Sequence, residues 1–348
     1  MNAVDYISKG RDMGASDVHI VSGICPKCRV DGKLVDLFPE IVGHDECEAL
    51  AKELAGRYYD EISEIGELDL AKTIAGERVR INLFRQQGEI SAALRILSNS
   101  IPKLATLGLP PVVSQFSSWQ KGIILVTGET GSGKSTTLAA ILDEINHSRA
   151  DHIITLEDPI EYIYTPDKCV INQREIGKDT ESYADGLRAI LREDPDVILI
   201  GEMRDLSTIE TALTAAETGH LVFATLHTNS AIDSVDRIVG VFPAERQSQI
   251  RLQLSTTLKA VLSQQLLPRR EGHGRVAACE VMLMTPAIQN LIREGKTPQM
   301  MSSMLASTAL GAITMDNCLI KMNRDRLISS DTAIEAAFDK EYLKKSVR

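Results

Sequence analysis

The sequence predicts an α/β protein whose parallel sheet is covered by helices on both faces and is preceded by a smaller α+β domain. From Gly122 onward, short apolar segments alternate with helical patterns, as in a parallel sheet whose strands are joined by helices. In much of residues 17–96, polar and apolar residues alternate, as in half-buried antiparallel strands. A segment with several prolines and glycines separates the two regions.

The first domain is predicted over residues 1–97. Alternating patterns predict strands, and one segment has helical spacing. The strands are expected at residues 17–21, 28–35, 78–85 and 90–96, and the helix at 46–58. A linker is predicted at residues 98–112, because Pro102, Gly108, Pro110 and Pro111 disfavour both helix and strand there.

Residues 113–348 form the predicted second domain. Its buried strands are expected at residues 123–127, 153–156, 197–201 and 221–225. The segment Val-Ile-Leu-Ile at 197–200 is apolar on both faces, which suits a parallel sheet covered on each side. From about residue 255 the pattern predicts helices, at 287–293, 315–322 and 332–338.

Composition restricts the classes of function. The chain has 348 residues, enough for two separate cores. Its 38 Lys and Arg against 48 Asp and Glu give a charge of −10, and aromatic residues make up 4%. This balance argues against a general nucleic-acid binder. Without a signal peptide or a run of about 18 apolar residues, we expect a cytosolic protein with no stable membrane insertion.

Cysteine spacing does not predict a metal centre. Of the six cysteines, only Cys25 and Cys28 have ligand-like spacing, and Cys47 alone does not supply a second pair. In a reducing cytosol we expect free thiols.

The strongest motif is a phosphate-binding loop. Residues 128–135 match the pattern G-x-x-x-x-G-K-[ST] between a predicted strand and a predicted helix, the context that this pattern requires. Lys134 is predicted to lie between the β- and γ-phosphates of ATP, and Ser135 to ligate Mg²⁺. The predicted nucleotide contacts are Gly128, Glu129, Thr130, Gly131, Ser132, Gly133, Lys134, Ser135 and Thr136.

Acidic residues follow two neighbouring strands. Glu202 ends the strand at 197–201 and is predicted to position or activate the attacking water. After the strand at 153–156, Glu161 is a candidate general base, and Glu157 or Asp158 a candidate for the metal shell. The carboxyl ends of parallel strands share one edge, so both sets can face the same nucleotide.

Two further pairs flank these strands. Asp194 and Asp196 precede the strand at 197–201 and are expected to cap its entry. His220 and His227 stand at the two ends of the strand at 221–225. We predict that these histidines sense the γ-phosphate or connect to the helical region.

Together these segments resemble the four signatures of the secretion-superfamily ATPases, which power type II secretion, type IV pili and related systems. The signatures lie at residues 128–135, 157–161, 201–205 and 218–228, and residues 15–19 agree as well. The resemblance extends over essentially the whole chain. It implies a PAS-like N-terminal domain, a RecA-like ATPase domain with a helical C-terminal part, and homohexamers that bind nucleotide at subunit boundaries.

Within that superfamily, the chain is most similar to the PilT-type retraction ATPases of type IV pili. Residues 287–294, Ala-Ile-Gln-Asn-Leu-Ile-Arg-Glu, resemble a motif that those ATPases need for retraction, with Gln289 in place of Arg. The four-cysteine zinc module of extension and secretion ATPases is missing, since only Cys279 and Cys318 lie in that region. The resemblance implies a platform protein of the inner membrane as partner and a place at its cytoplasmic face.

The resemblance also assigns two arginines of the first domain. Arg80 and Arg95 match residues that reach the γ-phosphate in this superfamily. Cations there would stabilise the charge of the transferring phosphoryl group. Strand register leaves Arg78 and Arg85 as alternatives. Loss of the γ-phosphate is expected to drive rotation between the domains about the linker.

Three alternatives remain open at this stage. The first alternative is a pilus extension or type II secretion ATPase. The second is an accessory PilT paralogue with little or no catalysis, and the third is a nucleic-acid translocase. The missing zinc module disfavours the first of these. The intact phosphate loop, Glu161 and Glu202 disfavour the second, although Gln289 leaves altered coupling open. The acidic charge disfavours the third.

Overall fold

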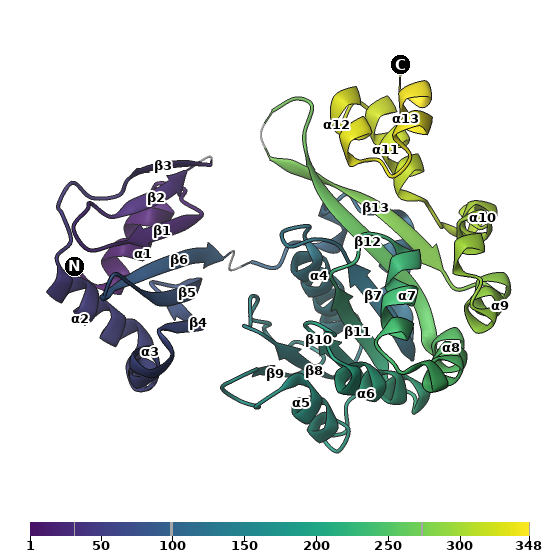
Figure 1. Ribbon diagram of the computed structural model, residues 1–348, viewed down its shortest axis with the longest axis horizontal. Helices are drawn as coiled ribbons and strands as arrows, with labels where there is room; N and C mark the ends of the chain where they lie inside the picture. The colour runs from purple at the N-terminus through teal and green to yellow at the C-terminus, as the bar shows by residue number, and fades with distance from the viewer. Residues whose placement is uncertain (31, 98–99, 273, 348) are drawn as a thin grey trace. The chain divides into compact units, whose positions relative to one another are not determined.

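The computed structural model describes residues 1–30, 32–97, 100–272 and 274–347 (Figure 1). The chain divides into two compact units, Met1–Ser100 with Pro159–Ile163, and Ile101–Asp158 with Tyr164–Arg348. Residues 98 and 99, the first two of the predicted linker, lie outside the described residues. The predicted first domain did not include the segment Pro159–Ile163.

The first unit is built on a six-stranded antiparallel sheet in the order β3-β2-β1-β6-β5-β4. On β5, next to the edge strand β4, Val79, Ile81 and Leu83 are buried, and the residues between them are more exposed. The strands are β1 (Asp17–Ile20), β2 (Lys27–Val30), β3 (Lys33–Asp36), β4 (Glu67–Ile74), β5 (Glu77–Gln86) and β6 (Glu89–Leu97). The helices are α1 (Ala3–Asp12), α2 (His44–Ala55) and α3 (Tyr59–Ile65).

The predicted helix and the strands predicted at 17–21, 78–85 and 90–96 are present. The range 28–35, predicted as one strand, holds the two antiparallel strands β2 and β3, and α1, α3 and β4 were not predicted. A local signal for α1 exists: Asn2 and Asp5 form a reciprocal capping box, a typical start of a helix. The signal for β4 is weaker, because Leu70 and Ala71 are buried side by side and interrupt the alternation.

The second unit holds a seven-stranded sheet in the order β13-β12-β7-β11-β10-β8-β9. All neighbours pair in parallel except β12 and β13. The strands are β7 (Gly122–Thr127), β8 (His152–Glu157), β9 (Val170–Glu175), β10 (Val197–Ile200), β11 (Leu221–Leu226), β12 (Leu258–Pro268) and β13 (Arg275–Leu283). Its longer helices are α4 (Lys134–Ser148), α5 (Tyr183–Ile190), α6 (Leu206–Glu217), α7 (Ala231–Gly240) and α8 (Ala244–Thr257).

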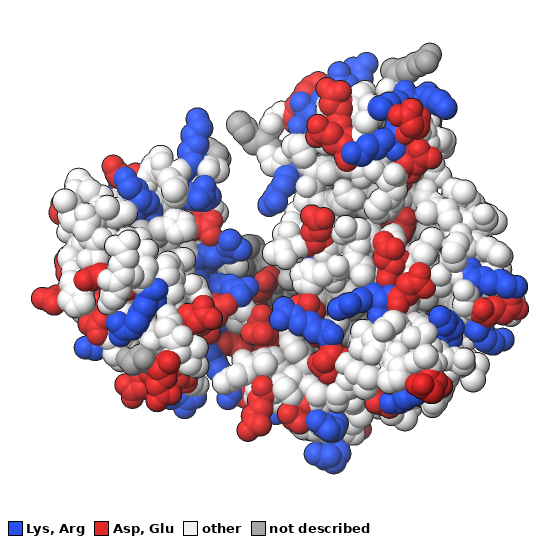
Figure 2. All heavy atoms as spheres, viewed as in Figure 1, with Lys and Arg blue, Asp and Glu red and all other residues white. Residues whose placement is uncertain are grey.

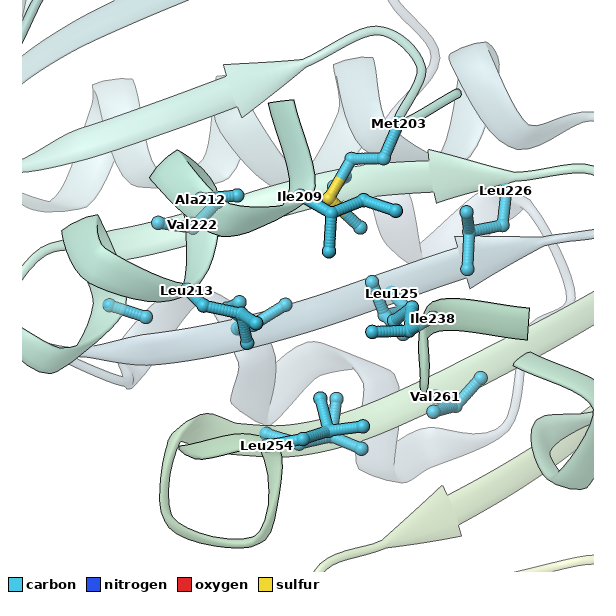
Figure 3. Close-up of a cluster of buried hydrophobic side chains, with 14 of the residues drawn as sticks. Leu125, Met203, Ile209, Ala212, Leu213, Val222, Leu226, Ile238, Leu254 and Val261 are labelled. Carbon is cyan, nitrogen blue, oxygen red and sulfur yellow. The ribbon is translucent and has the colours of Figure 1, made fainter. Parts of the chain in front are cut away.

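Both faces of this sheet are buried, as its apolar strands predict. Figure 3 shows one face, where side chains of α6, α7 and α8 meet β7, β11 and β12. Leu125 of β7 lies in this cluster, whereas its buried neighbours Ile124 and Val126 point to the other face, where α4 packs. The helices α4 and α6 thereby hold the loops at the ends of β7 and β10 against a fixed sheet.

The prediction of helices from about residue 255 is wrong for residues 258–268 and 275–283, which form the antiparallel strands β12 and β13. Leu258 and Ala260 to Ser263 are buried almost without alternation, so the apolar run carries no strand period. The predicted helices beyond are confirmed as α9 (Pro286–Glu294), α11 (Met315–Arg324) and α12 (Ser330–Ala336). They are accompanied by α10 (Met300–Ala306) and α13 (Lys340–Ser346), and α11 to α13 gather beside the hairpin (Figure 1).

Two surface properties bear on partners. In Figure 2, basic and acidic side chains are interspersed over the face in view. Among the described residues, no helix combines the length and the apolar character needed to cross a membrane.

Candidate nucleotide-binding site

Four adjacent parallel strands of the second unit end at one edge, and each leads into a segment predicted to carry chemistry. Thr127 of β7 is paired with Leu226 of β11, and Ile200 of β10 with Leu156 of β8. The phosphate loop, His227, Glu202 and Glu157 follow these ends directly. The shared edge was predicted from the parallel order, and the register confirms it.

The phosphate loop depends on glycines at two kinds of position. At Gly128 (φ 140°) a Cβ atom would lie 2.3 Å from the Gln264 carbonyl oxygen and 2.6 Å from Ser132 Oγ. Gly131 and Gly133 take φ values of 81° and 94°, which L side chains rarely adopt. Gly133 is the N-cap of α4, so the loop presents the positive end of that helix.

Two polar groups of the loop fit an anionic ligand. The Ser132 hydroxyl is buried and has no hydrogen-bond partner among the described residues. Lys134 is 9% exposed, and its Nζ donates hydrogen bonds to the carbonyl oxygens of Gly128 (2.7 Å) and Glu129 (2.9 Å). The loop thus holds its own cation over its centre, an arrangement that suits a phosphate.

Glu202 lies among cationic groups at the end of β10. Its Oε2 is 2.6 Å from Arg204 Nη2 and 3.4 Å from His227 Nε2. Burial acts to raise the pKa of this carboxyl, but the hydrogen bond from Arg204 and the charge of a protonated His227 outweigh it, so the pKa is lowered. Glu202 is therefore held as a carboxylate, the form that can position water.

Tyr183 completes this cluster and was missed from the sequence. A Cβ atom on Gly201 would lie 2.8 Å from its hydroxyl, so the glycine gives the ring its place beside β10. Burial, with the negative charges of Asp158 and Glu202, raises the pKa of Tyr183. Only the fold brings α5 to β10, so no local motif could have indicated this residue.

The metal-shell role of Ser135, Glu157 and Asp158 stays a prediction. Glu157 Oε1 accepts hydrogen bonds from Thr155 Oγ1 (2.6 Å) and Gln173 Nε2 (3.2 Å). Ser135 lies in the first turn of α4, directly after Lys134. In the described part of the chain, no group of three or more His, Cys, Asp or Glu is placed to hold a metal.

The prediction that His220 joins the nucleotide site of its own chain is wrong. His220 precedes β11 at the opposite end of the strand, beside the start of β7. Its Nδ1 lies 2.8 Å from the Ala215 carbonyl oxygen and 3.1 Å from Thr218 Oγ1. His227 is seven residues further on, about 20 Å away along an extended strand. Only His227 reaches the shared edge.

Asp196 holds the opposite edge of the sheet as predicted. Its Oδ2 accepts a hydrogen bond of 2.8 Å from the backbone N–H of His152, where β8 begins. Asp194 takes a positive φ of 55°, a turn conformation that aspartate tolerates.

The predicted arginines lie in the first unit, on one face of its sheet. Arg80 and Arg95 are direct cross-strand neighbours on β5 and β6. Arg80 pairs with Asp69, and Arg95 Nε lies 3.0 Å from Asp17 Oδ1. These carboxylates offset the repulsion between two cations placed opposite each other. Arg85 donates to the Gly88 carbonyl oxygen at the hairpin turn.

The acidic segment after β8 is divided between the units. Glu157 and Asp158 belong to the second unit, whereas Glu161 lies in Pro159–Ile163 of the first. Within that first unit, Arg78 Nε donates to the Ile160 carbonyl oxygen (3.1 Å). The role of Glu161 as a general base stays a prediction.

Cys25 and Cys28 are both free thiols in the first unit. Cys25 Sγ lies 3.0 Å from the Pro39 carbonyl oxygen, and Cys28 is fully buried. Burial raises the pKa of the Cys28 thiol.

A phosphate loop after β7, a carboxylate after β10 and the sheet edge that they share define an ATPase of the P-loop class. The family model of the type II/IV secretion system proteins matches residues 73–332. The chain belongs to this family.

Over most of its length, the chain is similar to ATPases of type IV pili. The chain is 44% identical to the type IV pilus retraction ATPase PilT of Pseudomonas aeruginosa, over 97% of this chain and 98% of that protein. It is 36% identical to the type IV pilus ATPase PilU of the same organism, over 94% and 86%. A crystal structure of the pilus retraction motor PilT with bound ADP matches with a TM-score of 0.93 at 46% identity, over 99% of both chains.

These similarities confirm the fold class and the family predicted from the sequence. They also confirm the predicted function, ATP hydrolysis by an enzyme of the pilus-retraction type.

Proposed function

We propose that the chain is the ATP-hydrolysing subunit of a homohexameric motor that retracts type IV pili. The single observation that carries the proposal is the shared edge of β7, β11, β10 and β8. There the phosphate loop, His227 and Glu202 follow strands that are paired in register.

Different residues of the chain have different roles in ATP hydrolysis. Lys134 and the loop N–H groups bind and orient the phosphates, and Ser135 would ligate Mg²⁺, which supplies further charge neutralisation when bound. Glu202 holds the attacking water in line, because Arg204 and His227 keep its carboxylate ionised and fixed. His227 connects this carboxylate to the loop before α7.

Charge from the first unit completes the proposed mechanism. Arg80 and Arg95 supply positive charge to the γ-phosphate, which makes hydrolysis depend on assembly. Both arginines already lie side by side with acidic partners, so they can exchange those partners for a phosphate without a new pairing of strands. Glu161 acts as a second base in this proposal.

The proposed partner is a platform protein of the inner membrane, reached from its cytoplasmic face. The support is the similarity to proteins named for pilus retraction and the helix α9, which carries the retraction-type motif at residues 287–294. On that helix Ile288 and Ile292 are buried, whereas Gln289, Asn290 and Arg293 are more exposed. The exposed side of α9 is the proposed output surface.

An accessory role beside a second ATPase is the alternative. The chain is 36% identical to the type IV pilus ATPase PilU, against 44% for PilT.

The two roles separate in a piliated bacterium that lacks its own retraction ATPase. Wild-type chain and the exposed-site control Glu335→Gln should restore twitching motility, and Glu202→Gln should not. Failure of the wild-type chain to restore motility in that strain, while the purified protein hydrolyses ATP, would assign the accessory role. Equal restoration by wild type and Glu202→Gln would contradict the motor.

A further inference from the structure

A buried carboxylate on β13 joins two helices. Glu280 of β13 is fully buried. Its Oε1 accepts a hydrogen bond of 2.8 Å from the backbone N–H of Ala231, and its Oε2 one of 3.3 Å from that of Met315. Ala231 is the first residue of α7, and Met315 the first residue of α11.

Among the described residues, charge compensation for this carboxylate comes from those helix ends. No ion pair of the described residues includes Glu280. A carboxylate away from water is costly unless it is hydrogen-bonded, and helix N-termini carry a partial positive charge. Burial raises the pKa of Glu280, and the two N–H groups act against that rise. The N-terminus of α7 and the N-terminus of α11 therefore both stabilise the Glu280 carboxylate, and this shared carboxylate joins the two helices.

The first of the two helices begins at the nucleotide site. His227, beside Glu202, is separated from α7 by a loop of three residues. That loop is fixed to the helix: Thr228 Oγ1 lies 2.7 Å from Ser234 Oγ, which is 2.7 Å from the Ser230 carbonyl oxygen. A displacement of His227 is therefore passed to the N-terminus of α7.

The second helix begins the C-terminal helices. Leu319 of α11 packs with residues of α12 and α13 in one apolar cluster, which also includes Ala278 of β13. The segment before α11 is held to the same strand, because Val281 and Ile313 form an isolated antiparallel bridge. Glu280, one residue before Val281, thus lies where the hairpin meets the start of α11.

We infer that Glu280 is a positioning residue that couples the nucleotide-sensing loop at His227 to the C-terminal helices by binding the N-termini of α7 and α11 together. The inference rests on the proposed function, because it requires nucleotide turnover at the phosphate loop. When α7 shifts, the hydrogen bond from Ala231 weakens, and the buried carboxylate has to move or lose half its partners. Either response changes the bond to Met315.

Hydrogen exchange of the full-length protein, followed by mass spectrometry, tests this coupling. Samples without nucleotide, with ADP and with a non-hydrolysable ATP analogue are compared for wild type, Glu280→Gln and the control Glu335→Gln. In wild type and control, nucleotide should alter exchange both at residues 228–234 and at residues 314–319, by about tenfold. In Glu280→Gln the response at 228–234 should remain, and that at 314–319 should be lost.

The outcomes test the coupling through Glu280 and the proposed function separately. Failure of wild type to bind a fluorescent ATP analogue would refute the proposed function. Binding without any response at 314–319, or an unchanged response in Glu280→Gln, would overturn the coupling alone. Glu280→Asp, whose shorter side chain cannot reach both helices, provides a second variant. If circular dichroism shows both variants unfolded, Glu280 is only a structural residue and the inference fails.

Discussion

Arg204 forms an ion pair with Glu202, with 2.6 Å between Nη2 of the arginine and Oε2 of the glutamate. The arginine side chain is 69% exposed, whereas that of the glutamate is 17% exposed. The pair therefore joins a solvent-facing cation to a carboxylate held at the sheet edge. Because exposed ion pairs contribute little to stability, the main effect of this pair is on the ionisation state of Glu202.

Replacing this arginine should alter the pH dependence of ATP hydrolysis. Although burial raises the pKa of Glu202, Arg204 and His227 bring it below its ordinary value. In Arg204→Gln the pKa should rise, so the acid limb of the pH profile of kcat should move to higher pH. Steady-state assays from about pH 4.5 to 8 measure this. Arg188→Gln, which removes a similarly exposed ion pair on α5, should leave the limb in place, and an unmoved limb in Arg204→Gln would remove Arg204 from this role.

Lys134 should matter for binding and little for folding. Its Nζ donates hydrogen bonds to the carbonyl oxygens of Gly128 and Glu129, so Lys134→Ala should change the free energy of unfolding without nucleotide by about 1 kcal/mol or less. Affinity for a fluorescent ATP analogue should fall by about 100-fold or more. The exposed Lys121→Ala serves as control. Unaltered affinity in Lys134→Ala would show that the loop does not bind the phosphates.

Alanine substitutions at two glycines of the phosphate loop, Gly128 and Gly131, can be compared directly. Gly128→Ala places a Cβ atom against the Gln264 backbone, whereas at Gly131 nothing lies within 4 Å of such an atom. Both positions have positive φ, so Gly131→Ala should cost about 1 kcal/mol of unfolding free energy. Gly128→Ala should cost about 1–3 kcal/mol more through overpacking. Urea unfolding measures both, and equal costs would contradict the close approach of β12.

Asp205 should stabilise the protein in a pH-dependent way. It is the N-cap of α6, accepting hydrogen bonds from Thr208 N (2.9 Å) and Oγ1 (2.7 Å). Burial raises its pKa, but these bonds outweigh that effect and the net pKa is lowered. Its contribution is therefore present above the unfolded-state value and disappears as pH falls through the folded one.

At neutral pH, Asp205→Ala should cost about 1 kcal/mol of unfolding free energy. The difference from wild type should shrink as pH falls below about 4, measured by urea unfolding. Glu335→Ala, at an exposed position of α12, should show no such trend. A cost that does not change with pH would assign the effect to the lost side chain rather than to its charge.

Local patterns sufficed for much of this molecule. The loop at 128–135 was predictable because its strand, glycines and helix are contiguous, and Glu202 because its strand is apolar throughout. The face of β5 that holds Arg80 was predictable from alternation. In each case the signal lies within a dozen residues of chain.

Other features arise only from contacts distant in sequence. The hairpin of β12 and β13 has no alternation because β12 is buried on both faces. His220 looked equivalent to His227 because a sequence does not say which end of a strand meets the ligand. Tyr183 and Glu280 gained their roles from neighbours about 20 to 50 residues away, which no local motif encodes.

The central claim is that the sheet edge bearing Lys134 and Glu202 hydrolyses ATP in a hexamer. The most direct test is the steady-state ATPase rate of the purified protein, with its mass from light scattering. The account predicts Mg²⁺-dependent turnover by a hexamer, with Glu202→Gln binding ATP and hydrolysing it at least about 100-fold more slowly. A monomer that binds ATP without turning it over, or a Glu202→Gln variant as active as wild type, would contradict it.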